Sequence, residues 1–505
     1  MSRFFIAVAA VALQFFCLAA QATDAWPLPR PKLVVVVVID QFRADYLIRS
    51  RSQFSVGGFR ALIEGGAYFP FAEYDIMQSM TGPGHATILT GSYPYLAGIP
   101  INDWYDQDLH DSMYCTEDRS FETVGAPSRP HVGTSPKNLI GTTLGDEIKN
   151  AGLTSKQISI ALKDRASILL GGHRADLAIW QDNATKKWVS SRYYIKKGDL
   201  PSWVQALNAD PKLASCDTST PCGLELTEAA VESAIKSENL GSGTGTDLLT
   251  ISFSSHDYTG HKFGPNSPEI DQMTLSEDHM IQHLRSTLAH QMKTGLKDVV
   301  FVLTGDHGVA PAASYLQNTG IESGRIDEDG LRLDIEAQLN LKCATKTSGN
   351  WIGFFEDFNF YVNEAKLQGS KCDLAQVEAE MKSVLLKNKA FVAVFTRGEV
   401  LRHDLPPGLL GRQIAKTFYL GRTGNVVALP KPFYVNLSRN FATHMTGYSY
   451  DRMVPLIISG PGFKHGVFAG RTEVIDIAPT LAFALGVIPP ALSEGRVLSE
   501  ALQLK

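Results

Sequence analysis

The feature that most constrains this 505-residue chain is an uninterrupted apolar run, LVVVVVI, from Leu33 to Ile39, which ends in Asp40. β-branched residues favour extended backbone. A run without polar alternation is typical of a strand buried on both faces of a parallel sheet. Because α/β folds bind ligands at the carboxyl ends of such strands, Asp40 is a candidate site residue.

Similar patterns recur along the chain and alternate with helical periodicity. Strands are predicted at 159–162, 247–253, 299–303, 390–395 and 454–459, and helices at 54–63, 84–89, 140–151, 275–292, 375–386 and 474–485. The chain is long enough for one large domain with insertions, or for two or three smaller ones. The β-α alternation favours one α/β domain over residues 23–505, an α/β/α sandwich around a mostly parallel central sheet.

Two segments interrupt this alternation. The sequence from about 180 to 240 is polar, aromatic and irregular, and we interpret it as an insertion. A second insertion is predicted at 314–423, where amphipathic helices and aromatic segments would form a cap beside the sheet.

The N-terminus has the features of a secretory signal. Arg3 precedes an apolar run from Phe4 to Ala20, and Ala20-Gln21-Ala22 is a small-x-small cleavage sequence. Residues 1–22 are therefore predicted to be a signal peptide, with a retained membrane anchor as the alternative. This predicts a periplasmic or secreted protein with no stable membrane span after cleavage.

The cysteines of the mature chain fit an oxidising compartment. Cys216 and Cys222 flank a short polar segment and are candidates for a disulfide, and Cys343 with Cys372 is a plausible second one. Cys115 would then be left over. None of the spacings resembles a zinc-thiolate site.

The charge balance limits the partners of the protein. The net charge is -5 and the sequence has no long Lys/Arg block, so nucleic acid is not expected as a main partner. A negatively charged substrate would need a local positive site.

The stretch Met80–Gly91, MTGPGHATILTG, offers such a place. Thr81 carries a hydroxyl and is followed by Gly82, Pro83 and Gly84, which predict a turn before a helix. Free backbone N–H groups and the positive end of the helix dipole favour an anion there. Taken alone, the stretch also fits an ordinary strand-to-helix loop.

Acidic and imidazole side chains follow several of the predicted strands. These candidates are Asp40, then Asp257 and His261 in SSHDYTGH, Asp306 and His307 in LTGDHG, and His444 in FATHMTG. Carboxylate oxygen and imidazole nitrogen are suitable zinc ligands, and this set would fill two sites with positions left open for substrate. Two such ions about 4 Å apart could hold the attacking and leaving oxygens of a phosphoryl transfer.

The motifs VVIDQFR, MTGPGHAT, INDWYD, KDR, DYTGH, TGDHG, TH and IDIAPTL, spread over about residues 33–490, together resemble the alkaline phosphatase superfamily. The match is closest to its threonine-nucleophile, phosphate-irrepressible bacterial alkaline phosphatases. This resemblance implies that Thr81 is the nucleophile and forms a phosphothreonine that water hydrolyses.

The resemblance also implies the metal ligands and the phosphate contacts. One zinc ion would be held by Asp257, His261 and His444, and the other by Asp40, Asp306 and His307, with Thr81 bound to the second ion. Asn102, Lys163 and Arg165 would surround the non-bridging phosphoryl oxygens. His85 is not needed for either site, so packing or support of the loop is its expected role.

A dianionic phosphate monoester carries charge that two zinc ions do not contact, and a Lys with an Arg can stabilise it. The pair Lys163 and Arg165 therefore favours a monoesterase acting on small phosphorylated substrates.

Nucleotide pyrophosphatase/phosphodiesterases, which share the zinc site and the Thr nucleophile, are the main alternative. A sulfatase would need Cys or Ser in place of Thr81, and a serine protease would need a GxSxG-type context. A non-enzymatic zinc- or phosphate-binding protein is the remaining alternative. Whatever its function, the protein is expected to be a monomer.

Overall fold

The structure is a computed structural model that describes residues 28–127, 133–344, 346–436 and 441–504. The predicted signal peptide lies outside these residues. Within the described ranges, no helix has both the length and the apolar character needed to cross a membrane.

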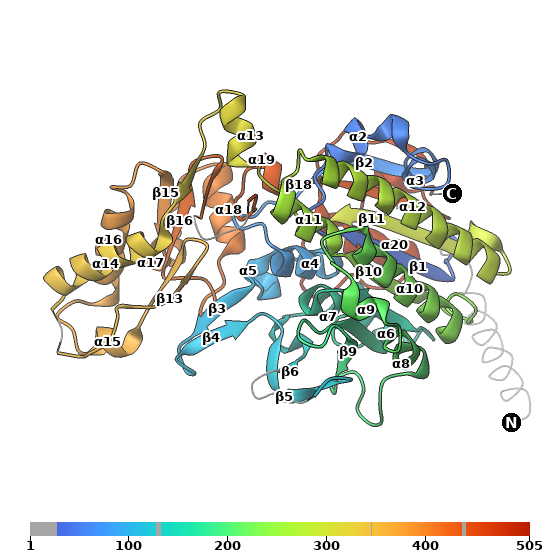
Figure 1. The fold of residues 1–505 in the computed structure, drawn as a ribbon, viewed down its shortest axis with the longest axis horizontal. Coiled ribbons are helices and arrows are strands. Elements are labelled where there is room, and N and C mark those ends of the chain that lie inside the picture. The colour runs from blue at the N-terminus through green and yellow to red at the C-terminus, as the bar shows by residue number, and fades with distance from the viewer. Residues whose placement is uncertain (1–27, 128–132, 345, 437–440, 505) are drawn as a thin grey trace, which may run out of the picture.

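A large mixed sheet forms the centre of the molecule (Figure 1). Across the described residues its strand order is β19-β2-β18-β11-β1-β10-β7-β8-β9-β5-β6, with β20 beside β2. The strands are β1 (Leu33–Ile39), β2 (Gly66–Glu73), β5 (Glu117–Val124), β6 (Gly133–Thr134), β7 (Gln157–Ala161), β8 (Leu177–Gln181), β9 (Trp188–Ser191), β10 (Asp247–Phe253), β11 (Val299–Gly305), β18 (Met453–Ser459), β19 (Gly466–Val467) and β20 (Thr472–Glu473).

The middle of this sheet is parallel, and its register determines where the site forms. Ile39 of β1 is aligned with Phe253 of β10 and with Gly305 of β11. The residues that follow these three strands therefore emerge at one edge of the sheet. The late strand β18 runs antiparallel to β11, so the sheet is mostly rather than wholly parallel.

The apolar run of β1 is explained by the layers on both sides of the sheet. Leu33, Val35, Val37 and Ile39 belong to one hydrophobic core, whereas the alternate residues, from Val34 to Val38, belong to another. Successive side chains of a strand point to opposite faces, so a strand between two helical layers must be apolar at every position. The predicted α/β/α sandwich is confirmed.

One helical layer contains α3 (Phe59–Gly65), α10 (Pro221–Glu238), α11 (Ser255–Phe263) and α12 (Pro268–Gln291). Figure 1 shows α10, α11 and α12 side by side on this face. The opposite layer contains α4 (Thr81–Thr90), α6 (Leu144–Asn150), α7 (Asp164–Gly171) and α20 (Ile477–Leu485).

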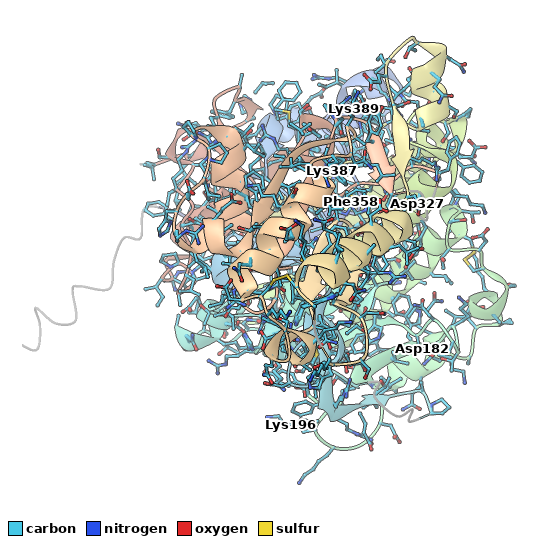
Figure 2. All side chains as sticks on the ribbon, turned by 90° about the vertical axis from the view of Figure 1, so that its left-hand side faces the viewer. Asp182, Lys196, Asp327, Phe358, Lys387 and Lys389 are labelled. Atoms are coloured by element: carbon cyan, nitrogen blue, oxygen red, sulfur yellow. A yellow bond between two sulfur atoms is a disulfide. The ribbon has the colours of Figure 1, made fainter. Side chains whose placement is uncertain are left out.

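A smaller antiparallel sheet lies beside the main one, on the left in Figure 1. Its strand order is β13 (Ile352–Glu356), β14 (Asn359–Val362), β16 (Val426–Pro430) and β15 (Phe391–Thr396). The helices α14 (Glu328–Lys342) and α16 (Leu374–Leu385) pack together beside it. We call these elements the cap. Figure 2 views the molecule from the cap side, with Asp327, Phe358 and Lys387 labelled.

Shorter elements complete the described chain. The remaining strands are β3 (Asp103–Asp106), β4 (Asp111–Tyr114), β12 (Gly324–Ile326) and β17 (Tyr434–Asn436). The remaining α-helices are α2 (Tyr46–Arg49), α5 (Pro94–Ala97), α8 (Ser202–Leu207), α9 (Lys212–Ser215), α13 (Ala313–Asn318), α15 (Glu364–Gln368), α17 (Arg397–Leu401), α18 (Leu409–Thr417) and α19 (Ser449–Arg452). Single 3-10 turns lie at Arg51–Gln53, Pro136–Asn138, Gly295–Asp298, Val474–Asp476 and Ser499–Ala501.

The structure confirms both predicted disulfides. Cys216 is bonded to Cys222, and Cys343 to Cys372. Cys115 is a buried free thiol.

Two local predictions are wrong. Thr81 does not precede the helix but is its first residue, and Gly82–Gly84 form the first turn of α4. Pro83 is tolerated because the first N–H groups of a helix need no intrahelical acceptor. The segment from about 180 to 240 is not irregular throughout, because α10 occupies 18 of its residues and buries Leu224 and Ala230 in the core.

Candidate active site

The first group of candidate ligands gathers at the edge where the parallel strands end. Asp40 follows β1, and Asp306 and His307 follow β11. The Nε2 of His307 lies 3.5 Å from Oδ1 of Asp40 and 3.3 Å from Oδ2 of Asp306. One ligand atom from each residue lies within 4.8 Å of the others. The spacing is that of a metal site.

The second group comes from α11 and from the loop before α19. Asp257 and His261 are separated by one helical turn, which places both side chains on the same face. The Nε2 of His261 lies 3.2 Å from Oδ1 of Asp257, and the Nε2 of His444 lies 3.6 Å from the same oxygen. His307 also reaches this group, because its ring stacks on that of His444 with 3.6 Å between the centroids. Asp257, His307 and His444 meet the same 4.8 Å spacing.

Backbone carbonyls orient all three imidazoles. The Nδ1 atoms of His261, His307 and His444 lie 2.8, 2.9 and 2.7 Å from the carbonyl oxygens of Ala442, Gly308 and Ser79. A ring that donates from Nδ1 keeps Nε2 as the unprotonated ligand atom. Burial lowers the pKa of His307 to about 3, which keeps its imidazole neutral.

The chemistry of these groups fits a divalent cation. Among the described residues, Asp40 Oδ1 and His307 Nε2 are buried and have no hydrogen-bond partner. Burial and the charge of Asp306 raise the pKa of Asp40 well above its usual range. Buried ligand atoms without partners are costly, and a bound metal ion would satisfy them. The oxygen and nitrogen donors suit zinc.

Thr81 lies beside both groups at the N-terminus of α4 and is buried. Its Oγ1 lies 3.4 Å from Nζ of Lys163 and 3.4 Å from Nη2 of Arg165. The backbone N–H of Gly82 donates to Oδ1 of Asn102 at 2.8 Å. The structure therefore brings the predicted nucleophile together with all three predicted phosphate-contacting residues.

Gly84 explains how α4 comes so close to the candidate metal ligands. A Cβ at this position would lie 2.3 Å from the carbonyl oxygen of Asp306. Only glycine allows this contact between the helix and the end of β11. His85, on the next position, has its Nδ1 3.1 Å from Oδ2 of Asp306 and its Nε2 2.9 Å from Oγ of Ser252.

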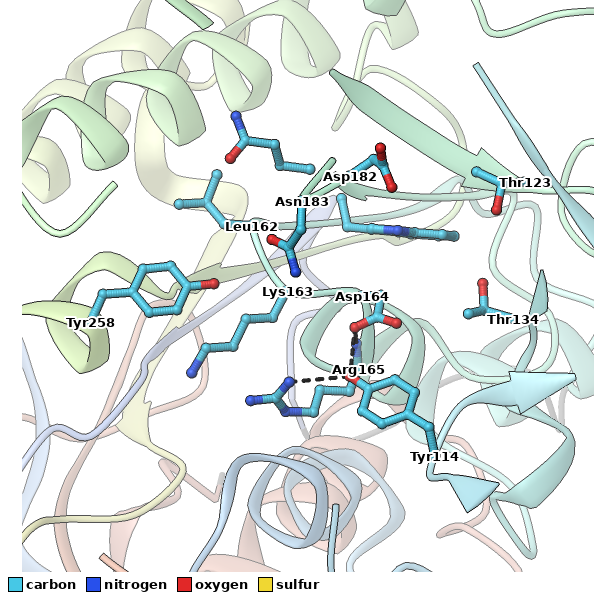
Figure 3. A pocket seen from close by; sticks show the side chains of 12 residues that line it. Tyr114, Thr123, Thr134, Leu162, Lys163, Asp164, Arg165, Asp182, Asn183 and Tyr258 are labelled. Atoms are coloured by element: carbon cyan, nitrogen blue, oxygen red, sulfur yellow. Dashed lines mark hydrogen bonds between the residues drawn. The ribbon is translucent and has the colours of Figure 1, made fainter. Parts of the chain in front are cut away.

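Lys163 lies between the two ligand groups. It follows β7, and its Nζ lies 2.7 Å from Oδ2 of Asp40 and 2.5 Å from Oδ2 of Asp257. Burial would lower the pKa of Lys163, but the two carboxylates outweigh burial and raise it. Its amine also lies 5.1 Å from the ring centroid of Tyr258, on α11 (Figure 3). Lys163 is thus a fixed positive charge at the site.

Arg165 is held by a hydroxyl from the small β3–β4 hairpin. Its Nη1 donates to the hydroxyl of Tyr114 at 3.1 Å, and that hydroxyl donates to Oδ1 of Asp164 at 2.6 Å, as the dashed lines of Figure 3 show. Arg165 therefore has one Nη towards Tyr114 and the other towards Thr81. Tyr114 carries no motif signal that sequence analysis could have used.

A cavity of about 220 Å³ opens on this constellation. Thr81, Asn102, Arg165, Asp257, His261 and His444 line it, together with Glu356 and Asp357. The last two lie at the turn between β13 and β14, so the cap contributes one wall of the site.

Comparison with known proteins defines the class to which this fold and site belong. The sequence model of the type I phosphodiesterase / nucleotide pyrophosphatase family matches residues 34–444. The chain belongs to this family, and the predicted relationship to the alkaline phosphatase superfamily is confirmed.

Individual relatives cover almost the whole chain. It is 31% identical to alkaline phosphatase PafA of Elizabethkingia meningoseptica, over 96% of each chain. It is also 31% identical to alkaline phosphatase PhoV of Synechococcus elongatus, over 94% of this chain and 93% of PhoV.

Solved structures agree with these matches. The crystal structure of PafA superposes with a TM-score of 0.87 at 30% identity, over 95% of this chain and 100% of PafA. A PafA variant with Thr-to-Ser, Asn-to-Ala, Lys-to-Ala and Arg-to-Ala substitutions superposes with a TM-score of 0.86 at 29% identity, with the same coverage. Murine ectonucleotide pyrophosphatase/phosphodiesterase 5, with a TM-score of 0.55 and 16% identity over 90% of this chain and 95% of its own, shares the fold alone.

Proposed function

We propose that this protein is an alkaline phosphatase that hydrolyses phosphate monoesters through a covalent phosphothreonine on Thr81. The observation that carries this proposal is the placement of Lys163 and Arg165, each 3.4 Å from Oγ1 of Thr81. The likeness to PafA and PhoV over nearly the whole chain supports it. The substituted PafA variant supports the choice of residues, because its changed residue types match Thr81, Asn102, Lys163 and Arg165 in the same order.

In the first step, Oγ1 of Thr81 gives up its proton and attacks the phosphorus of the monoester, the bond to the alcohol oxygen breaks, and that oxygen takes up a proton from water as the alcohol leaves. Arg165 and Lys163 bind the non-bridging oxygens and stabilise their charge, and Asn102 holds the backbone of Gly82 beside them. In the second step, water attacks the phosphothreonine, which releases inorganic phosphate and restores the Thr81 hydroxyl.

Two zinc ions are the cofactors that we propose for the two ligand groups. One would be held by Asp40, Asp306 and His307, with the Thr81 oxygen as a further ligand. The other would be held by Asp257, His261 and His444. When bound, zinc would lower the pKa of the attacking hydroxyl or water and neutralise the charge that develops on the leaving oxygen.

The monoester preference follows from charge. A monoester presents a dianionic phosphoryl group, and the two cations next to Thr81 match it. A diester is monoanionic and carries a second substituent where these cations lie. A diesterase remains the second candidate, because the matching family model describes phosphodiesterases and nucleotide pyrophosphatases.

We further propose that the enzyme works in the periplasm or outside the cell, as a monomer on small phosphorylated substrates. The two disulfides support an oxidising compartment.

A chelation experiment tests the function. The purified enzyme is assayed at alkaline pH with an aryl phosphate monoester and an aryl sulfate, before chelation, after chelation, and after zinc is restored. We expect monoester hydrolysis that is lost with the metal and recovered with zinc, and little sulfate hydrolysis. Metal binding without monoester turnover would instead identify a non-enzymatic binding protein.

A further inference from the structure

Gln41 directly follows the candidate ligand Asp40 and has an unusual backbone conformation. Its φ is 67°, in the left-handed region, and its side chain is completely buried. Residues other than glycine seldom adopt this conformation, and where they do the surrounding structure must hold them there. The cost of this conformation indicates that the position of Gln41 serves the adjoining site.

The contacts of Gln41 connect the two ligand groups. Its backbone N–H donates to Oδ1 of Asp306 at 2.9 Å, and its side-chain Nε2 donates to Oδ1 of Asp257 at 2.6 Å. Gln41 is also joined to Asp40 by a peptide bond. One residue therefore touches or adjoins all three carboxylates, which come from the ends of β1 and β11 and from α11.

Gly260 makes room for this side chain. An added Cβ at Gly260 would lie 1.8 Å from Oε1 of Gln41, and its next nearest atoms, at 2.9 and 3.5 Å, also belong to Gln41. Gly260 lies on α11 between Asp257 and His261, so the helix that carries the second ligand group packs against the Gln41 amide.

We propose that Gln41 is a positioning residue that fixes the carboxylates of Asp257 and Asp306 relative to each other, and that Gly260 admits its amide. This role rests on the proposed metal sites. The Nε2–H of Gln41 fixes the orientation of the Asp257 carboxylate, and its backbone N–H fixes that of the Asp306 carboxylate. A single residue therefore sets the geometry of both ligand groups. Partners of metal ligands of this kind typically contribute about 10- to 100-fold to metal affinity.

A double-mutant cycle separates this role from simple packing. Gln41→Gly removes the amide and keeps a residue that tolerates the left-handed conformation. Gly260→Ala displaces the amide and leaves Gln41 in place. In the double variant the added methyl group no longer meets the Gln41 side chain. If both single substitutions weaken zinc binding by removing the Gln41 amide from its position, their effects on zinc affinity must be strongly non-additive. Gly243→Ala is the control, since a Cβ there meets no atom within 4 Å.

Zinc affinity is measured for each variant by competition with a chromogenic chelator, and thermal unfolding is measured on the metal-free proteins. We expect each single variant to bind zinc about 10- to 100-fold more weakly than the wild type. The double variant should bind no more weakly than Gln41→Gly, and the control should match the wild type.

Several outcomes would overturn the role. Unchanged zinc affinity in Gln41→Gly would do so, as would losses that simply add in the double variant. A lower unfolding temperature of the metal-free protein with unchanged affinity would show that Gln41 serves packing alone. A wild-type protein that binds no zinc would overturn the metal sites themselves, which distinguishes that failure from the failure of Gln41.

Discussion

The Nζ of Lys163 lies 2.7 Å from Oδ2 of Asp40, in the interior of the molecule. A second contact, with Oδ2 of Asp257, makes Lys163 the positive charge shared by both carboxylates. Removing one partner of a buried ion pair leaves a buried charge without compensation. Lys163 therefore has a structural role in addition to its proposed contact with the phosphoryl group.

The variant Lys163→Ala should lower the free energy of unfolding of the metal-free protein by about 3 kcal/mol. Lys149→Ala is the matched control, because Lys149 forms its ion pair with Asp176 near the surface, and its loss should cost less than about 1 kcal/mol. Urea unfolding of both variants checks the difference. Equal effects would contradict the buried role of Lys163.

Replacing Thr81 should separate chemistry from metal binding. Thr81→Ala removes the proposed nucleophile, so kcat for an aryl phosphate monoester should fall by about a thousandfold or more. Thr81→Ser keeps a hydroxyl and should retain far more activity. Zinc content should be unchanged in both variants, since Asp40, Asp306 and His307 remain. An active Thr81→Ala variant would rule out the phosphothreonine.

Tyr114 should affect activity indirectly, because its hydroxyl holds the side chain of Arg165 in position. Tyr114→Phe keeps the ring but deletes the hydroxyl that accepts from Nη1 of Arg165, so kcat/KM for the monoester should fall by about tenfold. Tyr193→Phe is the control, because its hydroxyl donates to the carbonyl of His173, and its activity should equal that of the wild type. If the two variants behave alike, Tyr114 does not position Arg165.

Asp75 should contribute stability that depends on pH. Burial would raise its pKa, but hydrogen bonds and charges from Arg412 and Lys416 hold the pKa below its usual value. A carboxylate whose pKa is lowered by folding stabilises the protein above its unfolded pKa, and this contribution is lost as the pH falls through the folded pKa.

The variant Asp75→Asn should accordingly lower the free energy of unfolding by about 1 kcal/mol at pH 7, because Arg412 and Lys416 are partly exposed and solvent weakens their interaction with Asp75. The difference from the wild type should shrink below about pH 4. Urea unfolding of the wild type and of Asp75→Asn, from pH 7 to below about pH 4, measures this difference in the free energy of unfolding. A difference that does not depend on pH would contradict the ionised state of Asp75.

Much of the fold could be predicted from sequence, because its signals are local. The uninterrupted apolar run of β1 indicates a strand buried on both faces. In the structure, Ile39 aligns with Phe253 and Gly305, as a parallel sheet requires. Parallel strands share one carboxyl edge, so residues after the strands were expected to meet. Asp40, Asp306 and His307 do meet there.

The parts of the fold and of the site that were not predicted depend on tertiary contacts, which leave no local pattern in the sequence. The first turn of α4 contains two glycines and a proline, which predict a turn rather than a helix. The close approach of Gly82 to Asn102 and of Gly84 to Asp306 explains the two glycines. Gln41 and Tyr114 act through residues distant in sequence, and a single chain does not reveal such partners. His307 lies close to both ligand groups, which the spacing of the motifs alone did not indicate.

The most direct test of the central claim is the ratio of kcat/KM for an aryl phosphate monoester to that for the matching alkyl aryl diester, measured on the zinc-loaded enzyme. With Lys163 and Arg165 beside Thr81, the ratio should favour the monoester strongly, and Arg165→Ala should reduce it by about a hundredfold. A wild-type enzyme that prefers the diester would contradict the account and identify a phosphodiesterase.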